Sequence, residues 1–378
     1  MNKEEKVGNN ILVIGNGFDL AHGLPTKYND FMVAIKKCKS LKINPEAKPD
    51  SKETYINTMK LVAEQNGFIK YFLDYTNEVP GWIDLERLIK DIIEYFKLFF
   101  DSYQEIIKAG GLIYKDLVDP SADNIKKIRL IECLFEFPLF RENKNVDKYD
   151  VGRIMKVEYY TDKFGLNKKK ILELLKKQLN EVIELLCSYL EDYCYDKQKD
   201  KLKIKKQISD IHPCYVISFN YTDTYKVYGI KAEDVFHVHG SIEKKNMVLG
   251  FDDDEPENLD FVYFKKYFQR IQKLTGYIDQ HRFDIKKCSA EVTSPANINS
   301  NIMVERDVEP IVHFYGHSMD KTDGDVIKKL KKISRGFVIY KYSQEDYEQK
   351  VINLIDVFGK KDAMDMIEKG FIKFENCK

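Results

Sequence analysis

The chain has 378 residues, of which 43% are hydrophobic and 32% are charged. This composition is typical of a soluble globular protein with a sizeable core, and the length allows roughly two domains. Lys plus Arg and Asp plus Glu both number 61, and this neutral balance argues against general electrostatic binding to nucleic acid.

The cysteines and the hydropathy pattern predict the compartment. The seven cysteines include no Cys-x-x-Cys pair and are odd in number. We therefore expect buried thiols in a reducing cytosol, and neither disulfides nor a bound metal. No run is long and apolar enough to span a membrane, and the N-terminus lacks the pattern of a signal peptide. The sequence thus favours a cytoplasmic protein with no membrane association.

The first predicted element is a strand at residues 11–14, Ile-Leu-Val-Ile, which runs directly into Gly15-Asn16-Gly17. A short apolar run closed by glycines is typical of a strand buried on both faces. Amides that follow such a strand commonly bind phosphate, and glycine lets the backbone approach a ligand closely. Leu20 stands where the dinucleotide fingerprint has its third glycine, so the same residues also fit a plain tight turn.

A long, mostly helical region follows. Apolar residues at three- and four-residue spacing predict helices from Trp82 to Phe100 and from Ile171 to Tyr193. Asp84 and Glu86 lie in the first turn of the earlier helix, where they either complement the helix dipole or reach a ligand. The basic run at 197–206 is typical of a solvated helix or loop.

Strand patterns return in the second half of the chain, alternating with helices. The predicted strands are Cys214–Ser218, Val235–His239, Met247–Gly250, Pro310–Tyr315, Gly336–Lys341 and an edge strand at Phe371–Phe374. Helices are predicted at about 258–274, 323–333 and 344–357. The acidic residues at 252–255 are more typical of a solvated loop than of a metal site.

This order predicts an α/β fold with a mostly parallel, Rossmann-like sheet flanked by helices. Residues 8–25 and 206–378 would form the nucleotide-binding core, and residues 26–205 a helical insertion or cap after the first strand.

Four predicted strands end in polar turns that contain glycine or an amide. These turns are Gly15-Asn16-Gly17, Ser218-Phe219-Asn220, His239-Gly240-Ser241 and Gly316-His317-Ser318. Because the carboxyl ends of parallel strands share one edge of a sheet, we expect these turns to surround a ligand crevice.

Within this set, His239 and Asn220 have the chemistry of a catalytic pair. A neutral histidine can take a proton from a hydroxyl group, and an asparagine amide can orient water or hydroxyls without adding charge. A strand-end histidine that bonds the backbone accounts for His239 as well. His237 lies two residues earlier on the same predicted strand face and could take the same role, whereas His317 and His22 line the site or are structural.

The order of these motifs resembles the AbiH abortive-infection family of bacterial antiphage proteins. It also resembles the sirtuin-like NAD-binding fold of antiphage NAD hydrolases. The segments that carry the resemblance are Val13–Pro25, Trp82–Glu86, Ser218–Thr222, His239–Ser241 and Gly316–Asp320. The Cys-x-x-Cys zinc module and the Arg-containing cofactor loop of sirtuins are missing, which counts against protein deacylation and leaves cleavage or binding of NAD.

The resemblance implies a role for each matching residue. Gly15, Asn16 and Gly17 would contact the pyrophosphate, Asn220 the nicotinamide ribose, and His239 would be catalytic. Gly316 and Ser318 would lie near the adenosine, and Asp19 and Asp323 near the ribose or nicotinamide. The remaining members of the implied cofactor-binding set are Phe18, Gly240 and His317.

Three functions remain open on the sequence. The first is an antiphage NAD hydrolase that releases nicotinamide, which would be expected to act as a homo-oligomer under a phage-derived trigger. The second is a non-catalytic module that senses NAD or a related nucleotide and acts through a partner. The third is a nuclease, for which the neutral charge balance offers little support.

Overall fold

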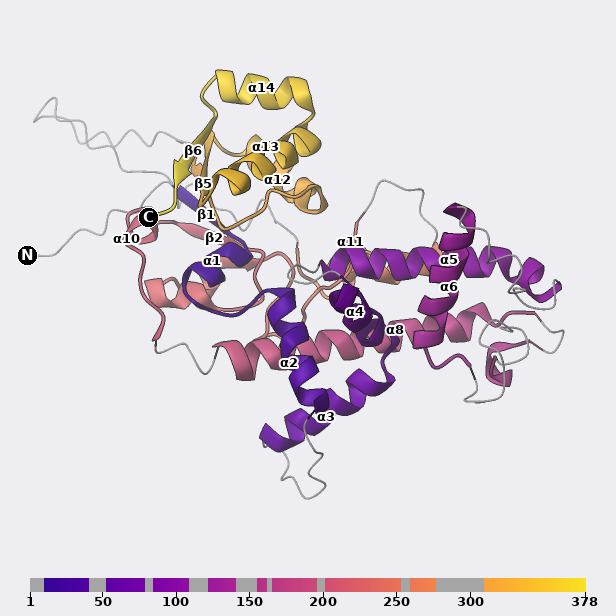
Figure 1. The fold of residues 1–378 in the computed structure, drawn as a ribbon. Helices are drawn as coiled ribbons and strands as arrows, with labels where there is room; N and C mark the ends of the chain where they lie inside the picture. The colour runs from indigo at the N-terminus through magenta and orange to yellow at the C-terminus, as the bar shows by residue number, and fades with distance from the viewer. Residues whose placement is uncertain are drawn as a thin grey trace, which may run out of the picture. The chain divides into compact units, whose positions relative to one another are not determined.

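The computed structural model describes residues 10–40, 52–78, 84–108, 122–140, 155–161, 165–195, 201–252, 259–276 and 309–378 (Figure 1). These residues form two compact units. The sheet unit comprises residues within Met1–Thr26, Leu190–Val248 and Arg270–Lys378. The helical unit comprises residues within Lys27–Tyr189 and Leu249–Gln269.

The sheet unit is built on six parallel strands in the order β3-β2-β1-β4-β5-β6. Their bounds are β1 Asn10–Ile14, β2 Tyr215–Ser218, β3 Val235–His237, β4 Ile311–Tyr315, β5 Gly336–Lys341 and β6 Ile372–Asn376. This is the strand order of a doubly wound sheet, in which the chain reverses direction across the sheet between β1 and β4. The predicted mixed α/β fold with a parallel sheet is therefore confirmed.

Helices and short helical turns connect these strands. They are α1 Asn16–Ala21, η3 Tyr189–Tyr195, α10 Lys206–Ser209, η5 Thr224–Tyr228, η6 Ala232–Asp234, η9 Lys321–Asp323, α12 Gly324–Lys332, α13 Gln344–Phe358 and α14 Lys360–Glu368. Ser343 caps α13 by accepting a hydrogen bond from the Asp346 amide. The helix α13 packs against β5 and α14 packs against β6, in yellow in Figure 1.

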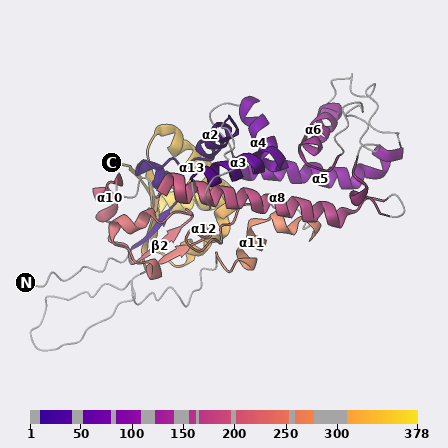
Figure 2. The ribbon, with the colours of Figure 1, turned by 90° about the horizontal axis from the view of Figure 1, so that it is seen from below.

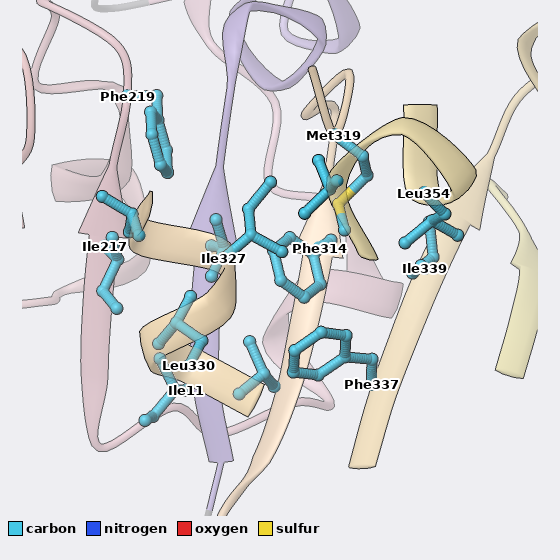
Figure 3. Close-up of a cluster of buried hydrophobic side chains, with 14 of the residues drawn as sticks. Ile11, Ile217, Phe219, Phe314, Met319, Ile327, Leu330, Phe337, Ile339 and Leu354 are labelled. Atoms are coloured by element: carbon cyan, nitrogen blue, oxygen red, sulfur yellow. The ribbon is translucent and has the colours of Figure 1, made fainter. Parts of the chain in front are cut away.

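The strand β1 is buried on both faces, as its continuous apolar run predicts. Ile11 and Val13 face a core that includes Ile327 and Leu330 of α12, and Figure 3 shows these helical side chains packed over the strands. Leu12 and Ile14 face the opposite core, which contains Phe18. The alternation places β1 at the centre of the unit, so residues at its carboxyl end are held on a rigid support.

The helical unit contains the two longest helices among the described residues, α5 and α8, and α4 packs against both (Figure 2). Its elements are α2 Tyr28–Ser40, α3 Lys52–Gln65, α4 Gly67–Glu78, α5 Leu85–Lys108, α6 Ala122–Glu136, η2 Val157–Tyr159, α8 Lys168–Ser188, η7 Leu259–Phe264 and α11 Lys266–Gln272, whose last residues belong to the sheet unit. Both predicted amphipathic helices are present. Trp82 lies outside the described residues.

The strand predicted at Met247–Gly250 is wrong, because this segment is irregular. Its backbone finds other partners: the Val248 amide bonds the His239 carbonyl. The Gln269 side chain bonds both the amide and the carbonyl of Leu249. Since these groups are already satisfied, the segment does not need to join a sheet.

Five cysteines, Cys38, Cys133, Cys187, Cys194 and Cys377, are free thiols. Cys214 is disulfide-bonded, so the prediction of thiols does not hold for it. Across the described part of the chain, no helix has the length and apolar character needed to cross a membrane.

The ends of β1 and β4 approach each other through glycines. The Gly17 amide donates a hydrogen bond of 2.8 Å to the Gly316 carbonyl. A Cβ added at Gly15 or Gly17 would stand 2.7 Å from the backbone of Gly316 or His317, and one added at Gly316 would stand 2.1 Å from the Phe18 nitrogen. Gly316 also has φ of 67°, which disfavours any residue with a side chain. The two strand ends can therefore meet because these positions lack side chains.

Replacing Gly316 with alanine should strongly destabilise the sheet unit. The control is Gly370→Ala, because Gly370 has a similar φ of 70° but nothing within 4 Å of its added Cβ. We expect the control to cost about 1 kcal/mol from backbone strain alone. Gly316→Ala should cost at least roughly 2 kcal/mol more, from the added clash. Urea denaturation of both variants measures the difference, and equal losses would contradict the close contact.

Candidate functional site

A buried carboxylate lies between two histidines at the carboxyl edge of the sheet. Nε2 of His239, in the turn after β3, is 3.2 Å from Oδ1 of Asp323. Nε2 of His317, directly after β4, is 3.4 Å from Oδ2 of the same carboxylate. All three side chains are at most 10% exposed. Asp323 ends η9 and precedes α12, so three separate segments supply this cluster.

The surroundings of His317 fix its tautomer. The Met319 amide donates a hydrogen bond of 2.9 Å to Nδ1 of His317, so this nitrogen is the acceptor and Nε2 carries the proton toward Asp323. The Phe219 ring packs against both imidazoles, with centroid distances of 4.2 Å to His317 and 5.4 Å to His239. His317 therefore contacts the Asp323 carboxylate on one side, and the Phe219 ring packs against the two imidazoles.

His239 lies beside a buried carboxylate. Its Nε2 is 3.2 Å from Oδ1 of Asp323, although the two atoms do not form a well-aligned hydrogen bond. A carboxylate at this distance can stabilise the imidazolium that forms when a neutral histidine takes up a proton as a general base. Its position is also fixed through the backbone, because the His239 carbonyl accepts a 2.8 Å hydrogen bond from Val248. Gly240 follows with φ of 76°, and a Cβ there would clash with the Asn246 carbonyl at 2.2 Å.

His237 belongs to a different cluster. Its Nδ1 is 3.1 Å from the Asn220 carbonyl, and its Nε2 is 3.5 Å from Asp223, which also pairs with Lys226 at 2.9 Å. Burial alone would raise the pKa of Asp223, but hydrogen bonds from His237 and Lys226 outweigh it and lower that pKa to about 2. The two histidines thus face separate carboxylates. Both ring nitrogens of His237 are used within its own cluster, with the Asn220 carbonyl and with Asp223.

Asp19 of α1 is buried beside the turn that follows β2. One carboxylate oxygen accepts a hydrogen bond from Thr222, whose hydroxyl is 3.1 Å from that of Thr224. Burial raises the pKa of Asp19 to about 6, although hydrogen bonding by Thr222, Thr224 and Asn220 opposes the rise. Asp19 is therefore a carboxylate poised to titrate near neutral pH.

Asn220 is held next to this carboxylate. Its backbone amide and carbonyl both bond the Ser218 hydroxyl, at 3.2 and 3.1 Å. Within the described residues, neither its buried Nδ2 nor Oδ1 of Asp19 has a well-formed hydrogen bond, although the Asn220 amide is close enough to favour the ionised carboxylate. An amide whose donor side is buried beside an acid directs its carbonyl oxygen away from that acid.

The glycine turn after β1 is occupied by internal hydrogen bonds. The Gly17 and Phe18 amides bond the carbonyls of Gly316 and Gly15, both at 2.8 Å. The Phe18 side chain is fully buried in the core and packs on the His22 ring. These residues therefore shape the edge of the sheet, and the two amides do not remain open for a pyrophosphate.

The other predicted contacts differ in their surroundings. Asn16 is exposed, and its side chain accepts a 2.6 Å hydrogen bond from Thr26. Ser318 is also exposed, and its carbonyl accepts a 2.8 Å bond from Asn353. His22 is structural: its ring nitrogens contact the Phe18 carbonyl and a tyrosine hydroxyl at 2.7 Å, and burial lowers its pKa.

The acidic residues at the start of α5 have structural partners within the helical unit. Asp84 caps the helix by accepting from the Arg87 amide at 3.1 Å. Glu86 pairs with the buried Lys266 at 2.7 Å. Of the predicted acidic loop, residues 253–255 lie outside the described residues. In the described part of the chain, no three His, Cys, Asp or Glu side chains are arranged to hold a metal ion.

Sequence reasoning missed three parts of the site: Thr222 as a partner of Asp19, Phe219 as the ring between two histidines, and the sharing of Asp323 by both histidines. The spacing Thr-Asp-Thr at 222–224, directly after a predicted strand, was the available indication for the first. The other two join segments far apart in the chain and leave no local pattern.

The parallel sheet, its strand order and the buried polar clusters at its carboxyl edge define an α/β protein of the doubly wound class. Residues 11–342 match the family model described as Bacteriophage abortive infection AbiH. The chain belongs to this family and, with it, to the antiphage abortive-infection proteins. No curated protein and no solved structure matches the chain.

Replacing Asp19 with asparagine should change how stability depends on pH. The native state holds the Asp19 proton more tightly than the unfolded chain, since burial raises its pKa from 3.8 to about 6. Wild-type stability therefore falls, relative to Asp19→Asn, as pH rises through this window. From pH 5 to pH 7 the difference should grow by about 1 kcal/mol.

Urea denaturation of both proteins at the two pH values measures this difference. Asp210→Asn is the control, because Asp210 is exposed, and it should show no comparable change. A difference that stays constant or reverses with pH would contradict the burial of an ionisable Asp19.

Proposed function

We propose that this abortive-infection protein binds NAD at the carboxyl edge of its sheet and cleaves the bond between nicotinamide and ribose. The observation that carries the proposal is the buried pair of His239 and Asp323 beside the β1–β4 reversal point. Doubly wound sheets of this strand order bind dinucleotides at that point. The pair supplies a base where such a ligand would lie.

Cleavage of the bond between nicotinamide and ribose depends more on a base that accepts a proton than on a strong nucleophile. As the C–N bond breaks, its electron pair passes to the pyridinium nitrogen, and nicotinamide leaves as a neutral molecule. The ribose carbon becomes cationic and is attacked by water, whose proton goes to His239 and then to solvent. Asp323 stabilises the imidazolium that forms.

Asn220 suits the positioning role. Because its donor nitrogen is buried beside Asp19, its carbonyl oxygen is the amide atom left to accept from a ribose hydroxyl or the attacking water. The amide adds no charge that would compete with the cationic sugar. Asp19, which accepts a hydrogen bond from Thr222, lies on the nitrogen side of the Asn220 amide and favours this orientation.

The phosphates would require donors other than the amides of Gly17 and Phe18, since both are bonded within the protein. The role we assign to Gly15 and Gly17 is to keep the edge free of side chains, so that a ligand can approach the backbone. Asn16 and Ser318 are exposed at the same turns and remain candidates for polar contacts with the ligand.

His239→Ala and Asn220→Ala should each abolish release of nicotinamide from NAD. We expect the loss of the base to lower turnover by at least about 100-fold. His212→Asn is the matched control, because His212 is exposed, and it should keep full activity. Circular dichroism checks folding. Each assay is run with and without extract from infected cells, because an antiphage hydrolase of this kind is expected to stay inactive until triggered.

Two outcomes would overturn the proposal. Tight NAD binding without turnover under any condition would make the protein a nucleotide sensor that acts through a partner or an oligomer. If the protein neither bound NAD nor cleaved it, NAD would be excluded as the ligand of this site.

A further inference from the structure

The turn that ends α11 is attached to both segments that carry the buried pair. Arg270 is 8% exposed and donates through Nη1 to both oxygens of Asp325, at 3.3 and 3.2 Å. Asp325 lies in the first turn of α12, two residues after Asp323. On the other side, the Thr275 hydroxyl donates to the carbonyls of His237 and Val238, at 2.6 and 3.4 Å. Val238 directly precedes His239.

The turn itself is tightly wound. The Thr275 amide bonds the Arg270 carbonyl at 2.9 Å. Leu274 has a positive φ of 51°, and Gly276 has φ of 77°. A Cβ at Gly276 would stand 2.4 Å from the Arg270 side chain. Lys273 also bonds the Met247 carbonyl, next to the residue that holds the His239 backbone. The turn is thus fixed to Arg270 and to the strand at the same time.

We propose that Arg270 and Thr275 are positioning residues that hold His239 against Asp323. The catalytic consequence rests on the function proposed above, whereas the holding role itself does not. An ordinary surface ion pair would be exposed and would bind one segment. Here the cation is buried, although the Asp325 side chain is 49% exposed, and the turn that Arg270 anchors bonds the neighbouring segment as well. Without these contacts the two segments are no longer held together, and a displacement of about 1 Å is enough to misplace a catalytic base.

Kinetics of four single variants, at Asp325, Thr275 and Arg270, test the catalytic consequence. Asp325→Asn and Thr275→Val should each lower kcat for nicotinamide release about tenfold or more, with little change in KM, because neither residue touches the ligand site. Arg270→Gln should do the same, and Arg270→Lys should retain more activity because it keeps the charge. Lys331→Gln is the control: Lys331 lies on α12, as Asp325 does, but its 3.8 Å ion pair is with Asp362 of α14, and its loss should leave kcat unchanged.

Hydrogen–deuterium exchange tests the holding role without any need for turnover. In Asp325→Asn, amides in the first turn of α12 should exchange faster than in wild type. In Thr275→Val, amides at 236–240 should do so, and in Lys331→Gln neither region should change. Unchanged exchange in both test variants would overturn the inference. Faster exchange in a protein that does not cleave NAD would support it while overturning the proposed function.

Discussion

The hydrogen bond between the Gly17 amide and the Gly316 carbonyl is the contact on which the rest of the site depends. At 2.8 Å it joins the ends of β1 and β4, the two central strands between which the chain reverses direction. Side chains at these glycines would separate the strands. This contact places His317, directly after Gly316, within reach of Asp323. This backbone hydrogen bond therefore sets the geometry of the carboxyl edge of the sheet.

The two carboxylates at this edge, those of Asp323 and Asp19, have different surroundings. Asp323 is shared by two imidazoles, whereas Asp19 has hydroxyl and amide neighbours and is costly to ionise. In the function that we propose, the Asp323 cluster supplies the base and Asp19 orients the Asn220 amide.

Much of the fold follows from local pattern, because apolar runs at 11–14, 311–315 and 336–341 ended in polar turns. Those turns also indicated the edge that carries the site. The features that the local pattern did not predict depend on contacts with residues far away in the chain. Met247–Gly250 looks like a strand, yet Gln269 satisfies the Leu249 backbone from 20 residues away. Phe18 follows a phosphate-type turn, but α1 begins at once and directs its ring into the core. The sharing of Asp323 could not be read from spacing at all.

The central claim is that the carboxyl edge of the sheet receives the ribose of NAD. A crystal structure of the His239→Gln variant with NAD tests this most directly, since loss of the base should preserve an uncleaved ligand. We predict NAD across the ends of β1 and β4, with a ribose hydroxyl or a single water within hydrogen-bond distance of the Asn220 side-chain oxygen. NAD bound elsewhere, or an edge that stays empty at saturating NAD, would contradict the account.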